Sequence, residues 1–271
     1  MASTNITQLL ATYIHALHIL HHHGVLDGYG HLSVRNPDNA ATFFMMHQRA
    51  PALVSGLDDI GEYRVSDAEP VSPGTPAAPL ERYIHSETLE RYPDINVVLH
   101  GHAGELVSYS ISDVPLRAAI HMAPFLGEEV PNFDITKYYL PNDTHDFLVR
   151  DQRLGAALAA EFDSHWGPGN KSSLVLMRSH GFTAIAADIE TTTYKGIYAV
   201  VNARVQSEAI KIQHAYSGPR AEGGGGIAYL TPRQIRDSWQ TEKQLIQRPW
   251  ALWVREVKVN PLYVNELDPD R

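Results

Sequence analysis

The sequence predicts an α/β protein with one compact domain and a C-terminal tail. Segments with helical periodicity alternate with short apolar runs of β-strand character, and Gly, Pro, Asn and Asp residues separate them. The chain has 271 residues, a length at which α/β folds commonly keep a single core. Because 44% of the residues are hydrophobic and 20% are charged, we expect an ordinary globular protein without wholesale disorder.

The first third of the chain is expected to form one helix followed by strands. Residues 6–20 repeat apolar side chains along one helical stripe, and Gly24 is a typical C-terminal cap. Three short β-like runs follow at residues 31–35, 42–46 and 62–65, each bounded by turn residues. These runs supply the first strands of the predicted sheet.

The segment "APLERYIHSETLERYP" is expected to form the second helix. Pro93 ends it, and Glu81 and His85 lie one turn apart on one of its faces. The apolar run "INVVLHGH" predicts a buried strand, and "GELVSYSIS" predicts the helix after it. A second apolar strand, "SLVLMRSHG", also ends in a histidine, and the longest predicted helix follows it.

The C-terminal part is expected to add a last helix and an aromatic tail. We place the domain at residues 1–216 and assign residues 217–271 to a linker, this helix and the tail. The glycines at 223–226 predict a flexible connection, and Thr231 and Pro232 suit the N-cap and first position of the helix. Aromatic side chains near a terminus need burial, so we expect the tail to pack on a neighbouring subunit.

The charge and hydropathy of the chain argue against two classes of partner. The net charge is −9, whereas nucleic-acid binding needs clustered Lys and Arg. No apolar stretch is long enough to span a bilayer, and "MASTNITQLL" lacks the features of a signal peptide. We therefore expect a cytoplasmic protein that binds neither nucleic acid nor membrane.

Histidines are the candidate ligands for a metal, because the chain has fifteen of them and no cysteine. His100 and His102 in "VVLHGHAG" share one face of a strand and can bind one ion. His180 ends the second apolar strand, and Glu81 on the preceding helix could add a carboxylate. The alternative is that these are satisfied core histidines and a solvated surface glutamate.

The densest histidine cluster is a weaker candidate. His21, His22 and His23 are consecutive in the last turn of the first predicted helix. Adjacent helical residues point about 100° apart, so three in a row cannot easily converge on one ion.

Two longer motifs resemble the class II aldolase/adducin superfamily. They are "PLERYIHSETLERYPDINVVLHGHAG" and "VLMRSHGFTAIAADIETTTY", and the resemblance covers roughly residues 8 to 216. It implies that His100, His102 and His180 bind a divalent metal ion and that Glu81 is the acid/base. It also implies a three-layer α/β/α fold with a central, mostly antiparallel sheet, assembled as a homotetramer with active sites at subunit interfaces.

The substrate-binding segments depart from the sugar-phosphate branch of that superfamily. In "GHLSVR", His31 stands where Asn is expected, and the next loop lacks the Thr-x-Ser-Gly pattern. This segment, "QRAPALV" and "IHMAPFLGEEVP" are similar to a branch that includes hydroxymethylpyridine-dicarboxylate and dihydroxyphthalate decarboxylases. Arg49, His121 and Ser33 are thereby assigned to substrate binding and His31 to catalysis. Alternatives are a loop salt bridge for Arg49 and a core position for His121.

These features predict a divalent-metal-dependent lyase, most simply a decarboxylase of hydroxylated aromatic or heteroaromatic carboxylates. The hypothesis is that Zn, Mn, Co or Fe chelates a ring hydroxyl and an adjacent carboxylate of the substrate. Carbon dioxide leaves, the metal stabilises an enolate-like intermediate, and Glu81 or His31 protonates the ring carbon.

Three other functions are compatible with the same residues. An aldolase, epimerase or dehydratase of sugars or 2-keto acids would use the same enolate chemistry. An Fe(II) oxygenase could use the same three histidines. A non-catalytic, adducin-like scaffold is the least favoured, because it would not need the metal ligands and Glu81.

Overall fold

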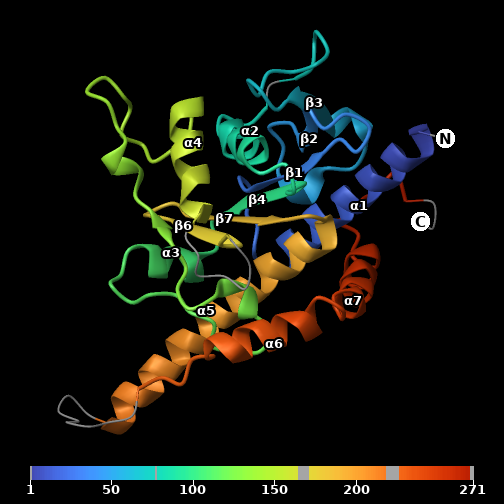
Figure 1. Cartoon of the computed structure of the whole chain (residues 1–271). Coiled ribbons are helices and arrows are strands. Elements are labelled where there is room, and N and C mark those ends of the chain that lie inside the picture. Colours follow the sequence, from blue (N-terminus) through green and yellow to red (C-terminus); the bar gives the residue numbers. More distant parts are fainter. Residues whose placement is uncertain (1, 77, 164–170, 218–225, 269–271) are drawn as a thin grey trace.

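A seven-stranded sheet forms the centre of the protein in the computed structural model, which describes residues 2–76, 78–163, 171–217 and 226–268 (Figure 1). The strand order is β3-β2-β1-β4-β7-β6-β5, and all neighbours are antiparallel except the pair β5 and β6. The strands are β1 (His31–Arg35), β2 (Thr42–Met46), β3 (Ile60–Arg64), β4 (Val97–Gly101), β5 (Asn132–Phe133), β6 (Leu174–Met177) and β7 (Gly181–Ala186).

Helices cover both faces of this sheet. Helices α2 and α4 pack together on one face, whereas α1, α3 and α5 lie on the other (Figure 1). The α-helices among the described residues are α1 (Ala2–His22), α2 (Arg82–Arg91), α3 (Gly104–Ser110), α4 (Gln152–Ala160), α5 (Ile189–Ser217), α6 (Pro232–Glu242) and α7 (Gln247–Lys258). None of the helices in the described part of the chain is long and apolar enough to cross a membrane. The predicted three-layer α/β/α architecture with a mostly antiparallel sheet is confirmed.

The alternation of side chains along each strand divides the core into two clusters. Along β4, Val97 and Leu99 face the cluster beneath α1 and α5, whereas Val98 faces the cluster beneath α2 and α4. Continuing this period of two places His100 on the same side as Val98. His31 and Ser33 of β1 lie on that side too, because Leu32 between them faces the opposite cluster. The face under α2 therefore carries the polar side chains.

The C-terminal part is more helical than the sequence predicts. Thr231 caps α6 as expected, with Pro232 in the first turn, but a further helix, α7, occupies part of the expected aromatic tail. Trp253 of α7 is buried in the cluster beneath α1 and α5, so this chain covers it by itself. Packing of the tail on a neighbouring subunit stays a prediction. Of the predicted flexible connection at 223–226, all but the last residue lies outside the described residues.

Candidate metal centre

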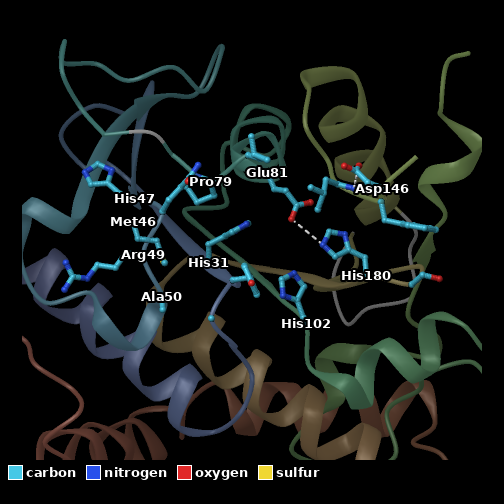
Figure 2. A pocket seen from close by; sticks show the side chains of 17 residues that line it. His31, Met46, His47, Arg49, Ala50, Pro79, Glu81, His102, Asp146 and His180 are labelled. Atoms are coloured by element: carbon cyan, nitrogen blue, oxygen red, sulfur yellow. Dashed lines mark hydrogen bonds and ion pairs between the residues drawn. The ribbon is translucent and has the colours of Figure 1, made fainter. Parts of the chain in front are cut away.

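Four side chains converge at one end of β4, as the sequence predicts. The ligand atoms of Glu81, His100, His102 and His180 all lie within 4.8 Å of one another. Oε2 of Glu81 is 3.3 Å from Nε2 of His180 and 3.6 Å from Nε2 of His100. Nε2 of His100 is 3.0 Å from Nε2 of His102. Figure 2 shows Glu81, His102 and His180 pointing toward one another.

Two glycines allow this convergence by bringing β4 and β7 close together. A Cβ atom on Gly181 would lie 2.2 Å from the carbonyl oxygen of Gly101, which is a severe clash. The sequence predicts His180 at the end of a strand. In the structure it lies instead in the turn between β6 and β7. Ser179, directly before His180, adopts a left-handed conformation (φ 58°) in that turn.

Glu81 is fixed from the opposite side of the site. It occupies the N-cap position of α2, whereas the sequence placed it inside the helix. Its side chain is buried, and Oε1 accepts a hydrogen bond from the backbone N–H of Val149 at 2.9 Å. This bond leaves Oε2 directed at the histidines.

The hydrogen bonds of His100 and His102 show what this cluster can hold. Nδ1 of His100 lies 3.0 Å from the carbonyl oxygen of Phe182, and Nδ1 of His102 lies 3.2 Å from both carboxylate oxygens of Asp27. Carbonyl and carboxylate oxygens only accept, so both Nδ1 atoms carry the proton and both Nε2 atoms present lone pairs. Burial and the neighbouring histidines lower the pKa of His100 well below its usual value, which disfavours a shared extra proton. The two Nε2 atoms are 3.0 Å apart, and a cation between them removes the repulsion of their lone pairs. The residues therefore fit a divalent metal ion.

A cavity of about 720 Å³ opens beside the cluster. Its lining has a polar side with Glu81, His102 and His180, and apolar walls from several elements (Figure 2). The apolar lining residues are Met46, Ala50, Pro79, Leu80, Phe147 and Leu148. A flat apolar ring with polar substituents suits such a cavity.

His31 and Arg49, both predicted from the sequence, line this cavity. His31 is almost fully buried, and its ring centroid is 4.9 Å from that of His100. Burial, followed by the neighbouring His85, lowers the pKa of His31 well below its usual value, so the ring is neutral. The side chain of Arg49 is about half exposed, and its Nη1 forms a 2.7 Å ion pair with Asp59.

Comparison with known proteins agrees with this geometry. The sequence profile described as Class II Aldolase and Adducin N-terminal domain matches residues 11–207. The chain belongs to the class II aldolase and adducin family. It is 45% identical over 258 residues to the decarboxylase tropJ of Talaromyces stipitatus, covering 94% of this chain and 96% of that protein.

One further sequence relative and one solved structure are more distant from this chain. The 3,4-dihydroxyphthalate decarboxylase of Arthrobacter keyseri is 28% identical over 191 residues, covering 67% of this chain and 71% of that one. The crystal structure of an aldolase II superfamily protein from Pseudomonas syringae has a TM-score of 0.71 at 16% identity, covering 97% of this chain and 96% of that chain. The family and the two decarboxylases named above indicate an enzyme of the lyase type.

Two predicted substrate-binding residues of this family member lie elsewhere. Ser33 is fully buried, and its hydroxyl lies 2.7 Å from Nδ1 of His85, so the expected direct contact with substrate has no support. His121 is 69% exposed in a loop, and the nearest carboxylate, of Glu242, is 3.8 Å away. Neither residue lines the cavity that the described residues of this chain form.

Sequence reasoning missed three residues that support the site. Asp27 binds His102, Val149 binds Glu81, and His85 binds His31 at 2.7 Å. Of the three, only His85 could be linked to the site from the sequence, because it follows Glu81 by four residues in the motif quoted above. Asp27 and Val149 are remote from their partners along the chain and have no distinctive pattern around them.

Proposed function

We propose that this protein is a divalent-metal-dependent decarboxylase of hydroxylated aromatic or heteroaromatic carboxylates. The observation that carries the proposal is the cluster of Glu81 with three histidines, which opens into a cavity with apolar walls and an arginine. Two relatives in the family bear the name decarboxylase, and one of them acts on a dihydroxyphthalate by its name.

In this proposal, His100, His102 and His180 hold the metal through their Nε2 atoms. A bound divalent ion would supply a Lewis acid for the negative charge that develops on substrate oxygen atoms. The hydrogen bonds from Nδ1 of His100 to Phe182 and from Nδ1 of His102 to Asp27 keep two of these rings oriented. Three imidazoles accept Zn, Mn, Co or Fe, so the proposal covers all four.

Arg49 and the apolar walls orient the substrate in this proposal. The ion pair with Asp59 engages only one end of the guanidinium, which leaves other N–H groups for a substrate carboxylate. Asp59 is fixed in turn by the backbone N–H of Ser55 at 2.7 Å. The faces of the aromatic ring contact Met46, Leu80 and their neighbours in the cavity wall.

Glu81 moves the proton in this proposal. It takes the proton of the ring hydroxyl when the substrate binds, so that the O–H bond breaks and a carboxylic acid forms. When the bond to the carboxylate carbon breaks, carbon dioxide leaves and its electron pair stays on the ring. Glu81 then returns the proton to the ring carbon, and its fixed Oε1 keeps Oε2 aimed at the reacting atoms. His31 is less suited to donate, because its lowered pKa keeps the ring neutral.

Assembly and location belong to the same proposal. We propose that the enzyme acts in the cytoplasm on a small molecule and assembles as a homotetramer, as the family resemblance implies. Light scattering of the purified, metal-loaded protein measures the number of subunits.

The test of the function is a screen for carbon dioxide release with the metal content measured on the same sample. Hydroxybenzoates, hydroxyphthalates and pyridine carboxylates form the panel, and each has a control without the ring hydroxyl. The proposal expects release only from hydroxylated substrates and only with metal bound. Oxygen consumption with Fe(II) but not with Mn(II) or Zn(II) would assign an oxygenase instead, and cleavage of phosphorylated sugars would assign an aldolase.

A further inference from the structure

The loop that holds Glu81 contains a residue with a strained backbone. This loop, residues 138–151, ends at Asp151, the N-cap of α4. Phe147 within it has a φ of 66°, in the left-handed region that a bulky aromatic residue rarely adopts. It lies two residues before Val149, whose backbone N–H bonds Oε1 of Glu81 at 2.9 Å. Strain of this kind persists only where neighbouring contacts hold it, and it is typical of active sites.

The hydroxyl of Tyr139 contacts Phe147 from outside the strained turn. Oη of Tyr139 accepts the backbone N–H of Phe147 at 2.8 Å. The ring of Tyr139 is partly buried against the core cluster beneath α2 and α4. His145 stacks on that ring with 4.3 Å between the centroids and 17° between the planes. The ring is therefore packed on the core and covered by His145, so its hydroxyl is a well-placed acceptor.

The other polar contacts of the turn are local and exposed. The backbone N–H of Leu148 donates to Oδ1 of Asp146 at 3.3 Å, and Asp146 forms an ion pair with Arg150. Asp146 and Arg150 are both exposed, and exposed ion pairs contribute little to stability. The side chain of Val149 is fully buried in the cluster beneath α2 and α4, but this burial leaves the direction of its N–H to the backbone before it.

We propose that the hydroxyl of Tyr139 holds Phe147 in its left-handed conformation and thereby keeps the N–H of Val149 on Oε1 of Glu81. Tyr139 does not line the cavity, whereas Asp146, Phe147 and Leu148 do (Asp146 is labelled in Figure 2). Tyr139 is thus a positioning residue for Glu81 that acts from behind the cavity wall.

The consequence is a link between one tyrosine hydroxyl and the aim of the carboxylate. Without the hydroxyl, Phe147 is free to relax to an ordinary conformation, and the N–H of Val149 then moves off Glu81. A small misplacement of a catalytic group lowers the rate without a matching loss of binding. The effect on the rate rests on the proposed function, in which Glu81 moves the proton, whereas the position of the Val149 amide does not.

The direct test is hydrogen–deuterium exchange of the Val149 amide, followed by NMR on the zinc-loaded protein. We expect Tyr139→Phe to raise this exchange rate roughly tenfold, as the loss of one hydrogen bond predicts. The amide of Leu99 in the middle of β4 should be unaffected and reports any global loosening. Tyr216→Phe, which removes an exposed hydroxyl on α5, is the matched control. Unchanged exchange at Val149, or an equal rise at Leu99, would overturn the proposal.

The role of the strain is tested in a second background. Asn adopts the left-handed region several times more readily than Phe, so Phe147→Asn needs less support from Tyr139. We expect Tyr139→Phe to raise the exchange of Val149 much less in Phe147→Asn than in the wild type. An equal rise in both backgrounds would show that Tyr139 does not act by holding this conformation.

Kinetics separates a positioning role from a merely structural one. We expect Tyr139→Phe to lower kcat for carbon dioxide release about tenfold while KM and zinc affinity stay unchanged. Normal kcat in this variant, or a matching loss of zinc affinity, would contradict the positioning of Glu81 by Tyr139. If the wild type releases no carbon dioxide, the proposed function fails, and the exchange measurements still decide whether Tyr139 holds the loop.

Discussion

The carboxylate of Asp27 lies 3.2 Å from Nδ1 of His102 and directs the opposite ring nitrogen to the metal cluster. The same carboxylate accepts the backbone N–H groups of Tyr29 and Gly30, both at 2.9 Å, at the mouth of the cavity. Burial acts to raise the pKa of Asp27, but these hydrogen bonds outweigh it and lower the pKa. One ionised side chain thus orients a candidate ligand and shapes the entrance.

Asp27→Ala should weaken metal binding without abolishing it. The loss of an orienting carboxylate behind a histidine ligand typically costs about 10- to 100-fold in metal affinity. Competition with a chelator measures this change, and Asp38→Ala in an exposed turn serves as the control. Equal affinities in the two variants would show that Asp27 has no part in holding the metal.

Glu81→Gln should keep the metal and lose most of the rate. The glutamine oxygen can still accept the N–H of Val149, so the fold of this region is preserved, but the amide cannot take up and return a proton. We expect a fall of about 10² to 10⁴ in kcat for carbon dioxide release. Glu208→Gln on the exposed surface of α5 is the control. A Glu81→Gln enzyme with normal turnover would remove Glu81 from the mechanism.

Arg49→Met should raise KM more than it lowers kcat. A hydrogen bond to a charged group contributes about 1.5 to 3 kcal/mol, which corresponds to roughly 10- to 150-fold in affinity. The effect should be largest for substrates with a second carboxylate, and Arg49→Lys should restore only part of it, because Lys lacks the planar fork. Steady-state kinetics on mono- and dicarboxylates decides the matter, with the exposed Arg233→Met as control. Unchanged KM values would place Arg49 outside the substrate site.

The folded protein should lose stability as the pH falls from 6.5 toward 4, in part through His18. Burial lowers the pKa of His18 to about 4, although its Nε2 donates to the carbonyl of Val54 at 2.8 Å. The pKa of His18 in the folded state is thus below its unfolded value of about 6.5. Its contribution to the free energy of unfolding is therefore intact above pH 6.5 and is lost as the pH falls toward 4. At pH 5 the loss from this group is about 2 kcal/mol.

Urea unfolding of the wild type and His18→Gln at pH 7.5 and pH 5 measures this contribution. The variant should show a smaller drop in the free energy of unfolding between the two pH values. His22→Gln, in the exposed last turn of α1, controls for the loss of a histidine. The same drop in all three proteins would contradict this assignment.

The candidate metal ligands could be predicted from the sequence because local rules bring them together. His100 lies on β4, whereas His102 is the first residue after the strand ends and not within it as expected; the glycine after His180 permits the close approach of β7 to β4. The family motif placed Glu81 beside them, although it stands just before α2 and not within it. The spacing of His100 and His102 and the glycine after His180 lie in short segments that a sequence pattern records, and the family resemblance joins these segments into one site.

The supporting contacts could not be predicted because they join residues far apart in the chain. The bond between Val149 and Glu81 spans 68 positions, and the bond between His102 and Asp27 spans 75. Ser33 was assigned to the substrate because its motif suggested it, but the register of β1 turns its hydroxyl to His85. Only the three-dimensional fold distinguishes a residue that contacts the cavity from one that lies behind it.

Some secondary structure was missed although a signal was present. In α7, Trp250, Trp253 and Val257 recur at helical spacing, but the two tryptophans favour, from the sequence alone, an aromatic tail that packs on another subunit. The histidines at the end of α1 contact this C-terminal part: His21 bonds Tyr263 and His23 bonds Glu256. Their density in the sequence therefore corresponds to packing between α1 and the C-terminal segment.

The most direct test of the central claim is the metal content and carbon dioxide release of His102→Ala, measured on the same sample. His102 supplies one of the two lone pairs that lie 3.0 Å apart, and its ring reaches the edge of the cavity. We expect the wild type to bind one divalent ion per chain, and His102→Ala to lose both the ion and the release of carbon dioxide. Unaltered metal content and turnover in this variant would contradict the account.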